Sequence, residues 1–434
     1  MLSAFARAFR TPDLRRKLLF TLGIMAVFRL GSFIPTPGVS YPNVQQCVAQ
    51  AGGSNDLIGL VNLFSGGALL QLSIFALGIM PYITASIIVQ LLRVVIPRFE
   101  ALQKEGQAGQ SKLTQYTRYL TIGLAVLQST TVITMARSGN LFPGCNVPLI
   151  PEDSVMTIVL MIVTMTAGTG LVMWLGELIT ERGVGNGMSL LIFTSIASGF
   201  PAALWSVAGG DNGIANFTVI IALLLLVTLL VVLVEQSQRR IPVQYAKRMV
   251  GRRMYGGSST YIPIKINMAG VIPVIFASSL LALPGLFAQF GDITSPWVQW
   301  ISVNLVSPSA PLYMAVYTLL IIFFAYFYTS ITFNPDDVAD NMKRYGGFIP
   351  GIRAGRPTAE YLQYVISRIT SAGALYLAGV ALIPVIVFAA LGLADTTSYA
   401  LGGTSILIVV GVGLQTVKEI DSQLQQRHYE GFLR

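Results

Sequence analysis

The sequence predicts an all-α integral membrane protein with ten transmembrane helices, and three observations support this fold class. The first is composition: of 434 residues, 53% are hydrophobic and 11% are charged, with a mean hydropathy of +0.67. A soluble chain of this length cannot cover its surface with so few polar residues. The second observation is a series of long apolar windows, and the third is the placement of basic residues between them.

The apolar windows set the number of membrane spans. Crossing about 30 Å of hydrocarbon takes roughly 20 residues of helix. Ten windows approach this length, near residues 18–36, 72–92, 118–136, 155–175, 187–207, 215–235, 271–290, 312–332, 371–392 and 403–418. The first window is long and has no small-residue cleavage site, so we expect it to remain as a span rather than to be removed as a signal peptide.

Basic residues are concentrated in alternate connections. If the N-terminus is cytosolic, 26 of the 28 Lys and Arg residues fall in cytosolic segments, which leaves Arg29 inside the first span and Arg137 on the outer side. Lys and Arg accumulate on the cytosolic side of membrane proteins. We therefore expect both termini in the cytosol, and we attribute most of the +9 net charge to topology rather than to nucleic-acid binding.

Two cytosolic connections are long and strongly basic. Residues 236–270 carry seven basic side chains and residues 333–370 carry five. The stretch 243–266 has β-prone runs around Gly251 and Gly256, which predict a projecting hairpin. From these residues alone two interpretations remain open: attraction to anionic membrane lipid, or docking of a large anionic partner such as ribosomal RNA, or of a motor protein.

Residues suited to catalysis or metal binding are scarce. The chain has one histidine, His428, and two cysteines, Cys47 and Cys145, in expected outer connections; Walker and Gly-x-Ser-x-Gly motifs are absent. We therefore expect no catalytic residue, no metal and no cofactor, which disfavours a membrane enzyme. The two cysteines face an oxidising compartment, so they either pair or remain two separate thiols.

The spans contain few ionisable side chains but several small or polar ones. Arg29 alone lies well inside a span. A secondary transporter is expected to place carboxylates near the membrane midplane, so this class is disfavoured too. The polar residues serve either close helix packing or a wet, separable seam; they include Thr84, Ser86, Gln128, Ser278 and Ser279.

A short apolar segment precedes the second span. Residues 57–70 are helix-like but too short to cross a membrane at about 1.5 Å per residue, and Ser65, Gly66 and Gly67 lie near their end. Such a segment is tolerated at membrane depth only when it is buried in protein or lines a cavity. We therefore expect a re-entrant or interfacial helix on the outer side.

Six motifs closely resemble the SecY/Sec61-alpha family of protein-conducting channels. They occur in the family's order over nearly the whole chain: NLFSGGALLQLSIFALGIMPYITASIIVQLL (62–92), ITERGVGNGMSLLIF (179–193), QRRIPVQYAKR (238–248), IPIKINMAGVIPVIFASS (262–279), PDDVADNMKRYGGFIPGIRAGRPT (335–358) and GGTSILIVV (402–410). One departure is Ala354, which stands where the family commonly has proline after the arginine of this loop.

The resemblance implies two inverted five-helix halves that close around a pore like a clamshell. The expected segments are a cytosolic amphipathic N-terminal segment 1–17, an N-terminal half 18–208, a C-terminal half 209–418 and a cytosolic tail 419–434. The C-terminal half includes the cytosolic loops of about 236–270 and 333–370. The halves open toward lipid between spans 2 and 3 on one side and 7 and 8 on the other, a lateral gate that includes Thr84, Ser86, Gln128, Ser278 and Ser279.

The resemblance also implies an apolar waist and a movable plug. Carried over by motif, the pore ring comprises Ile79, Ile83, Met188, Ile192, Ile275 and Ile408. An apolar constriction resists wetting and blocks ions, while flexible aliphatic side chains close around a passing chain. The plug covers about 57–70, with Leu57, Leu60, Asn62, Phe64, Ser65, Gly66 and Gly67.

A channel of this family conducts unfolded, signal-bearing polypeptides across the bacterial plasma membrane and releases transmembrane segments sideways into lipid. It is not an enzyme, since the SecA ATPase or the translating ribosome supplies the energy. Further implied partners are the membrane subunits SecE and SecG and membrane lipid. The implied docking residues for SecA and for ribosomal RNA are Arg239, Arg240, Arg252, Arg253 and Arg353.

Overall fold

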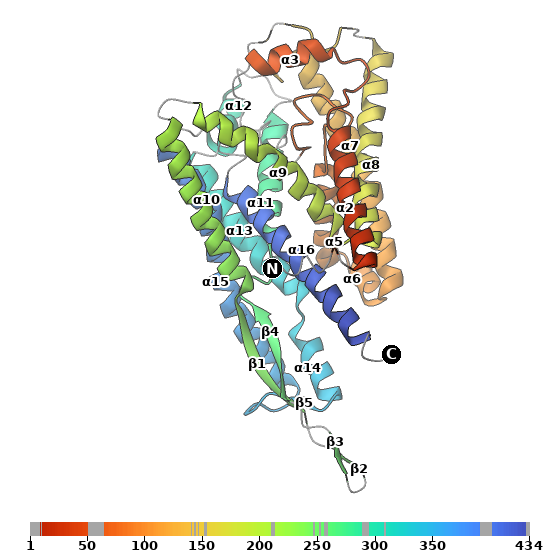
Figure 1. Cartoon of the computed structure of the whole chain (residues 1–434), viewed down its shortest axis with the longest axis vertical. Coiled ribbons are helices and arrows are strands. Elements are labelled where there is room, and N and C mark those ends of the chain that lie inside the picture. The colour runs from red at the N-terminus through yellow and green to blue at the C-terminus, as the bar shows by residue number, and fades with distance from the viewer. Residues whose placement is uncertain are drawn as a thin grey trace.

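The computed structural model describes most of the chain as a helical bundle with two small sheets at one end (Figure 1). The described residues are 11–50, 65–139, 154–209, 213–245, 259–288, 295–307, 310–390 and 402–430, together with residue 9 and parts of 141–151 and 248–255. All structural statements below concern these residues.

Each of the ten predicted spans overlaps a helix. Seven helices are long and apolar enough to span a membrane by themselves, which confirms the all-α membrane architecture. The ten helices are α2 (Pro12–Gly31), α5 (Met80–Val95), α7 (Gln107–Ser138), α8 (Val155–Arg182), α9 (Gly187–Ala208), α10 (Gly213–Gln236), α11 (Ile272–Ala288), α13 (Pro311–Thr332), α15 (Arg356–Ala390) and α16 (Gly403–Glu430).

The other three helices do not meet the length and composition criteria alone. Helix α5 meets them only together with α6 (Pro97–Lys104), and the chain bends by 103° between the two. Helix α11 is apolar over the shorter stretch Ile272–Leu281. Helix α2 starts before the predicted span and includes the basic residues Arg15, Arg16 and Lys17.

The predicted start of the second span, at residue 72, is wrong. Residues 66–79 form consecutive turns, and α5 begins only at Met80. Positive φ angles at Gly66, Gly67 and Gly78 interrupt a helix, and Pro81 favours the first turn of a new one. The expected helix through Leu70 is wrong for the same reason. These turns are buried, as irregular backbone at membrane depth must be.

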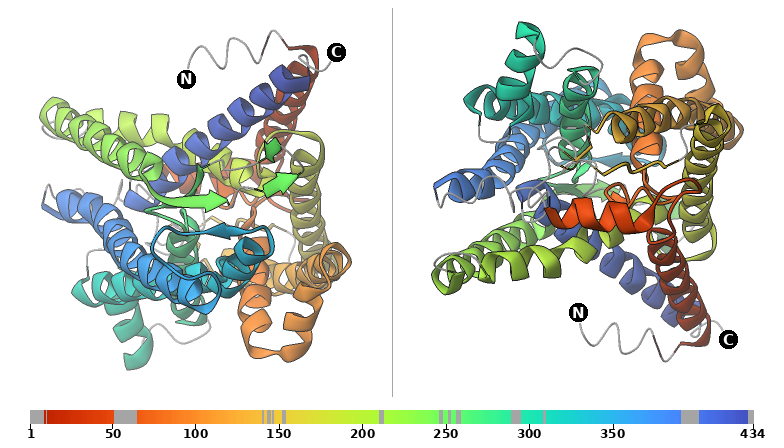
Figure 2. Two further views of the ribbon diagram at one scale, coloured as in Figure 1. Left: turned by 90° about the horizontal axis from the view of Figure 1, so that it is seen from below. Right: turned by 90° about the horizontal axis from the view of Figure 1, so that it is seen from above.

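We treat the helices of residues 12–208 and those of residues 213–430 as two groups, and their identity as two inverted halves stays a prediction. In the views along the long axis, the orange and olive helices lie on one side and the teal and lighter-blue helices on the other, whereas the dark-blue α16 runs across to the red α2 (Figure 2). The groups touch where α5 meets α11 and where α9 meets α10 and α16. One apolar cluster includes side chains from both groups.

The two basic loops fold together at the lower end of the bundle in Figure 1. Strand β1 (Gln238–Tyr245) pairs antiparallel with β4 (Ser259–Lys265) and also with β5 (Gly347–Phe348) of the second loop. The chain between β1 and β4 contains β2 (Arg248–Val250), paired with β3 (Arg253–Tyr255). The predicted hairpin is therefore present, but the sheet that joins the two loops was not predicted. Helix α14 (Pro335–Arg344) and an apolar cluster around Leu362 support this sheet.

The opposite end of the bundle carries short elements and a disulfide. Helix α3 (Tyr41–Gln50) lies there, as do α12 (Pro296–Ile301) and the π-helix η1 (Ser302–Val306). A disulfide joins Cys47 of α3 to Cys145, with a Cα–Cα distance of 5.5 Å. Of the two alternatives left open by the sequence, the structure therefore has the paired cysteines.

Candidate functional site

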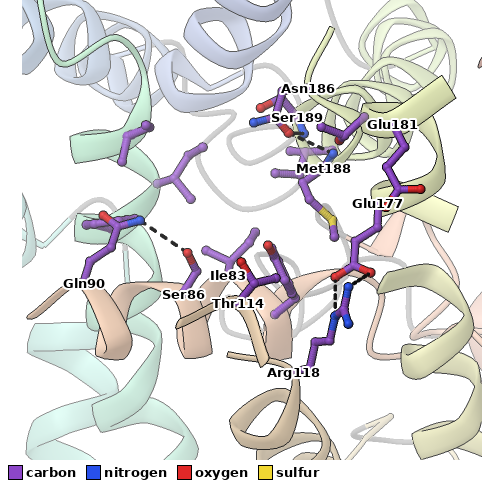
Figure 3. Close-up of a pocket in the computed structure, with 16 residues that line it drawn as sticks. Ile83, Ser86, Gln90, Thr114, Arg118, Glu177, Glu181, Asn186, Met188 and Ser189 are labelled. Atoms are coloured by element: carbon purple, nitrogen blue, oxygen red, sulfur yellow. Dashed lines mark hydrogen bonds and ion pairs between the residues drawn. The ribbon is translucent and has the colours of Figure 1, made fainter. Parts of the chain in front are cut away.

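A cavity of about 390 Å³ lies between the two halves, toward the end of the bundle where α8 ends and α9 begins. Side chains from both halves line it, so neither half encloses it alone (Figure 3). The lining residues come from α5, α7, α8, α9 and α11, with Asn186 from the connection between α8 and α9; they include Tyr82, Ser86, Gln90, Thr114, Arg118, Glu177 and Phe276.

The apolar wall of this cavity contains four of the six predicted ring residues. These are Ile83, Met188, Ile192 and Ile275. The other two, Ile79 and Ile408, are buried in the same apolar cluster but do not line the cavity. The structure thus brings side chains that are up to 329 positions apart into one cluster across both halves. Their function as a pore ring stays a prediction.

The position of Met188 follows from the cap of α9. The Asn186 side chain accepts hydrogen bonds from the backbone N–H groups of Met188 (3.1 Å) and Ser189 (3.4 Å), which is a regular N-cap. Gly187 lies so close to the Gly176 carbonyl of α8 that a side chain there would collide with it. The glycine-rich stretch 183–187 therefore allows α9 to start against α8.

The polar wall contains an ion pair that the sequence analysis missed. Arg118 of α7 donates from Nε to Oε1 of Glu177 (2.8 Å) and from Nη2 to Oε2 (2.7 Å), which is the bidentate geometry of a strong pair (Figure 3). The pair joins α7 to α8 beside the cavity. Glu177 is recognisable in the sequence as a carboxylate at the inner end of a span, but no local pattern indicates a partner 59 positions away.

The predicted gate residues occupy two facing helices and one neighbour. Thr84 and Ser86 lie on α5, Ser278 and Ser279 on α11, and Gln128 on α7. Helix α5 contacts α11 directly, and Ser86, which accepts a hydrogen bond from Gln90 (3.3 Å), lines the cavity. Among the described residues the Ser279 hydroxyl has no hydrogen-bond partner although it is buried. A lateral gate at this contact stays a prediction.

Most predicted plug residues, namely Leu57, Leu60, Asn62 and Phe64, lie outside the described residues. Ser65 is fully buried, and its hydroxyl accepts a hydrogen bond from the Leu69 N–H (3.2 Å). The carbonyl of Gly66 accepts a hydrogen bond from the Arg29 guanidinium. The end of the predicted plug segment is thus packed against α2.

The predicted docking arginines lie at the end of the bundle that carries the sheets. Arg239 and Arg240 are exposed on β1, and the Arg240 guanidinium stacks 4.8 Å from the ring centroid of Tyr261 on β4. Arg353 is exposed in the second loop, beside the sheet. Arg253 belongs to β3, whereas Arg252 lies outside the described residues. Docking itself stays a prediction.

Comparisons with known proteins agree on one family. The SecY family model matches residues 73–417. The protein translocase subunit SecY of Streptomyces coelicolor is 64% identical, and the alignment covers 100% of both chains. The family model and the full-length alignment therefore confirm the resemblance to the SecY family that the sequence motifs indicated.

Two solved structures share the fold. One is a SecY channel whose plug domain is described as stabilising the closed state and maintaining a membrane seal; its TM-score is 0.61 at 20% identity, covering 93% of this chain and 91% of that one. The other is Sec61 in the canine ribosome-channel complex of the endoplasmic reticulum, with a TM-score of 0.60 at 18% identity over the same shares. At such low identity, these likenesses concern the fold alone.

Proposed function

Because the chain belongs to the SecY family of protein translocase subunits, we propose that it forms the pore through which unfolded, signal-bearing polypeptides cross the bacterial plasma membrane. Transmembrane segments leave the same pore sideways into lipid. The chain supplies a passive path and performs no chemistry itself. The SecA ATPase or the translating ribosome supplies the energy.

The observation that carries this proposal is the apolar cluster at the cavity between the halves. A polypeptide in transit has no fixed charge or shape, so its path must not bind any one side chain. Ile83, Ile192 and Ile275 offer only aliphatic surface at the cavity, and Met188 adds a flexible thioether side chain. With Ile79 and Ile408 these residues form the proposed ring, which excludes water and ions when no chain is present.

The contact between α5 and α11 supports a lateral gate. Helix α9 also contacts α10, which follows it in the chain, and α16, and Leu14 and Leu18 of α2 pack with Ile420 of α16. These contacts suit a hinge, with the opening at the α5–α11 contact. The hydroxyls of Thr84 and Ser278 donate to carbonyls of their own helices (3.0 and 2.9 Å), so these hydrogen bonds persist when α5 and α11 separate. The gate includes Thr84, Ser86, Gln128, Ser278 and Ser279.

The outer side is closed by a plug formed by residues of about 57–70. The buried Ser65 and the two glycines that follow it support this assignment, since they hold the end of the segment inside the bundle. The plug leaves when a polypeptide enters. Both chain termini are cytosolic, as the distribution of Lys and Arg indicates.

The basic loops form the cytosolic docking surface. Arg239 and Arg240 on β1 contact ribosomal RNA together with Arg252 and Arg253 of the hairpin, and Arg353 engages SecA. The sheet that joins both loops supports a single platform for the two partners. The membrane subunits SecE and SecG complete the complex, and the exposed apolar residues of helices such as α10 contact them or lipid.

Site-specific crosslinking tests the proposed pore. The only two cysteines are paired, so a cysteine introduced at Ile83 is the only free thiol. We expect Ile83→Cys and Ile408→Cys, in the complete complex, to crosslink to a polypeptide stalled in transit. Ile87→Cys is the matched control, because Ile87 lies one turn from Ile83 on α5 with similar exposure (8% and 7%) but does not line the cavity. If neither ring position crosslinks, or if the control crosslinks equally, the pore assignment is wrong.

A further inference from the structure

Arg29 is the one basic side chain well inside a predicted span, and the structure gives it a specific contact. Its guanidinium Nη1 donates a hydrogen bond to the carbonyl of Gly66. Its Cζ atom also lies 4.7 Å from the ring centroid of Phe33, one turn further along the chain. A charged side chain in a span is costly and is usually retained for a function.

The backbone that Arg29 contacts is unusual. Gly66 and Gly67 have φ angles of +66° and +90°, a conformation that residues with a side chain rarely adopt. At Gly66 a Cβ atom would lie 3.1 Å from the Ser195 Cα of α9 and 3.2 Å from the Arg29 Nη1 atom. Gly66 is therefore held between α2 and α9, with Arg29 on one side.

Residues 72–75, which follow this turn, are attached to α2 and to the residues after α2 by contacts that do not include Arg29. The Ile74 N–H donates to the Ile34 carbonyl (2.9 Å), and the Thr36 N–H donates to the Leu72 carbonyl (3.0 Å). The rings of Phe28 and Phe75 stack with centroids 5.9 Å apart. These contacts do not involve Arg29, so residues 72–75 stay docked whether or not the Arg29 bond is made.

We propose that Arg29 is a positioning residue that clasps the Ser65–Gly67 turn in the resting channel. When the bond opens, the turn swings on its two glycines while residues 72–75 remain attached to α2. The Phe33 ring retains the released guanidinium through a cation–π contact. The inference rests on the proposed channel function, because the turn ends the proposed plug segment.

The strength of the bond sets the size of the expected effect. A hydrogen bond to a charged group shifts an equilibrium by about tenfold or more. Arg29→Met keeps an unbranched apolar side chain, shorter than that of arginine, and removes the donor. Arg29→Lys keeps a charged donor but loses the planar fork, so we expect an intermediate effect.

The experiment uses the complete complex in proteoliposomes, with Ser65→Cys as a buried reporter. We expect Arg29→Met to raise both the rate of alkylation of this cysteine by a water-soluble maleimide and the ion flux through the idle channel, each by about tenfold. We expect Arg29→Lys to reverse part of both increases. Arg16→Gln removes an exposed arginine from the same helix, and we expect it to leave both rates unchanged.

Each other result counts against the clasp. Unchanged alkylation in Arg29→Met would overturn it, and so would an equal increase in Arg16→Gln, which would indicate a general effect of charge. If the Arg29→Met complex does not assemble, the alkylation rate and the ion flux are measured in Arg29→Lys instead. If both stay at the wild-type value in Arg29→Lys, the proposed contact does not depend on the geometry of the guanidinium and the clasp is excluded. Crosslinking from Ile83→Cys in a separate preparation of the Arg29 variant, without Ser65→Cys, separates the two proposals: if crosslinking persists, only the clasp fails.

Discussion

At the scale of single residues, neighbouring side chains on one helix have different environments. Ile83 and Ile87 lie one turn apart on α5, and both are buried in the same apolar cluster. Only Ile83 reaches the cavity between the halves. The cluster therefore has members that pack the bundle and members that face the proposed path, and burial alone does not distinguish them.

A polar substitution separates these two roles. We expect Ile83→Ser to raise the ion conductance of the idle complex in planar bilayers, because a hydroxyl at the constriction favours wetting. Ile87→Ser removes the same atoms from the same helix without touching the cavity, and conductance should stay at the wild-type level. Both variants should lose roughly 2–4 kcal/mol of stability by thermal unfolding, as buried large-to-small changes do. Equal conductance in the two variants would argue against Ile83 as a ring residue.

At the scale of elements, the turns of residues 66–79 depend on a glycine of a neighbouring helix. A Cβ atom at Gly168 of α8 would overlap the carbonyl oxygen of Ile74. This oxygen belongs to the backbone of the turns and cannot rotate away. Helix α8 therefore needs a residue without a side chain where the turns pass it, whereas Gly170 has no neighbour closer than 3.6 Å to such an atom.

The two glycines give a matched pair of variants. We expect Gly168→Ala to destabilise the protein by about 1–3 kcal/mol, because an added methyl group forces the backbone of the turns to move. Gly170→Ala should be neutral or stabilising by up to about 1 kcal/mol, because alanine favours a helix. Thermal unfolding of the purified complex measures both. A stable Gly168→Ala variant would mean that the turns are not packed against α8 as described.

At the scale of the whole molecule, the two loops of residues 236–270 and 333–370 form one basic platform. Strand β1 of the first loop pairs with β5 of the second: Gln244 lies opposite Phe348, and Tyr245 lies opposite Gly347. The stacking of Arg240 on Tyr261 orders its guanidinium before any partner binds. A platform of this kind presents its charge in a fixed arrangement rather than on flexible chains.

Ribosome binding should depend on salt in proportion to this charge. If Arg239 and Arg240 contact phosphates of ribosomal RNA, the double variant Arg239→Gln/Arg240→Gln should weaken binding and reduce the slope of log K against log salt by about one per arginine. Lys112→Gln is the control, since Lys112 is an exposed lysine of α7, 3.7 Å from Glu105, and belongs to neither basic loop. Binding of purified ribosomes to proteoliposomes at several salt concentrations measures this. An unchanged slope in the double variant would assign the two arginines to lipid instead.

The sequence predicted those features that depend on local composition. Each apolar window overlaps a helix because hydropathy is a sum over neighbouring residues. The hairpin around Gly251 followed from β-prone runs and turn residues. The ring residues were assigned by motif, and four of them line the cavity. Of these, Met188 and Ile192 are four positions apart on α9, so helical spacing places both on one face.

The sequence by itself therefore determined that this is a helical membrane protein of the SecY family, how its spans are ordered and where its basic loops lie. Only the tertiary structure decided that Cys47 pairs with Cys145, that Arg118 pairs with Glu177 and that Arg29 contacts Gly66. It also decided that residues 66–79 form turns although they are as apolar as a span. The physical reason is that these contacts join residues far apart in the chain, and hydropathy and local propensity carry no information about which distant groups meet.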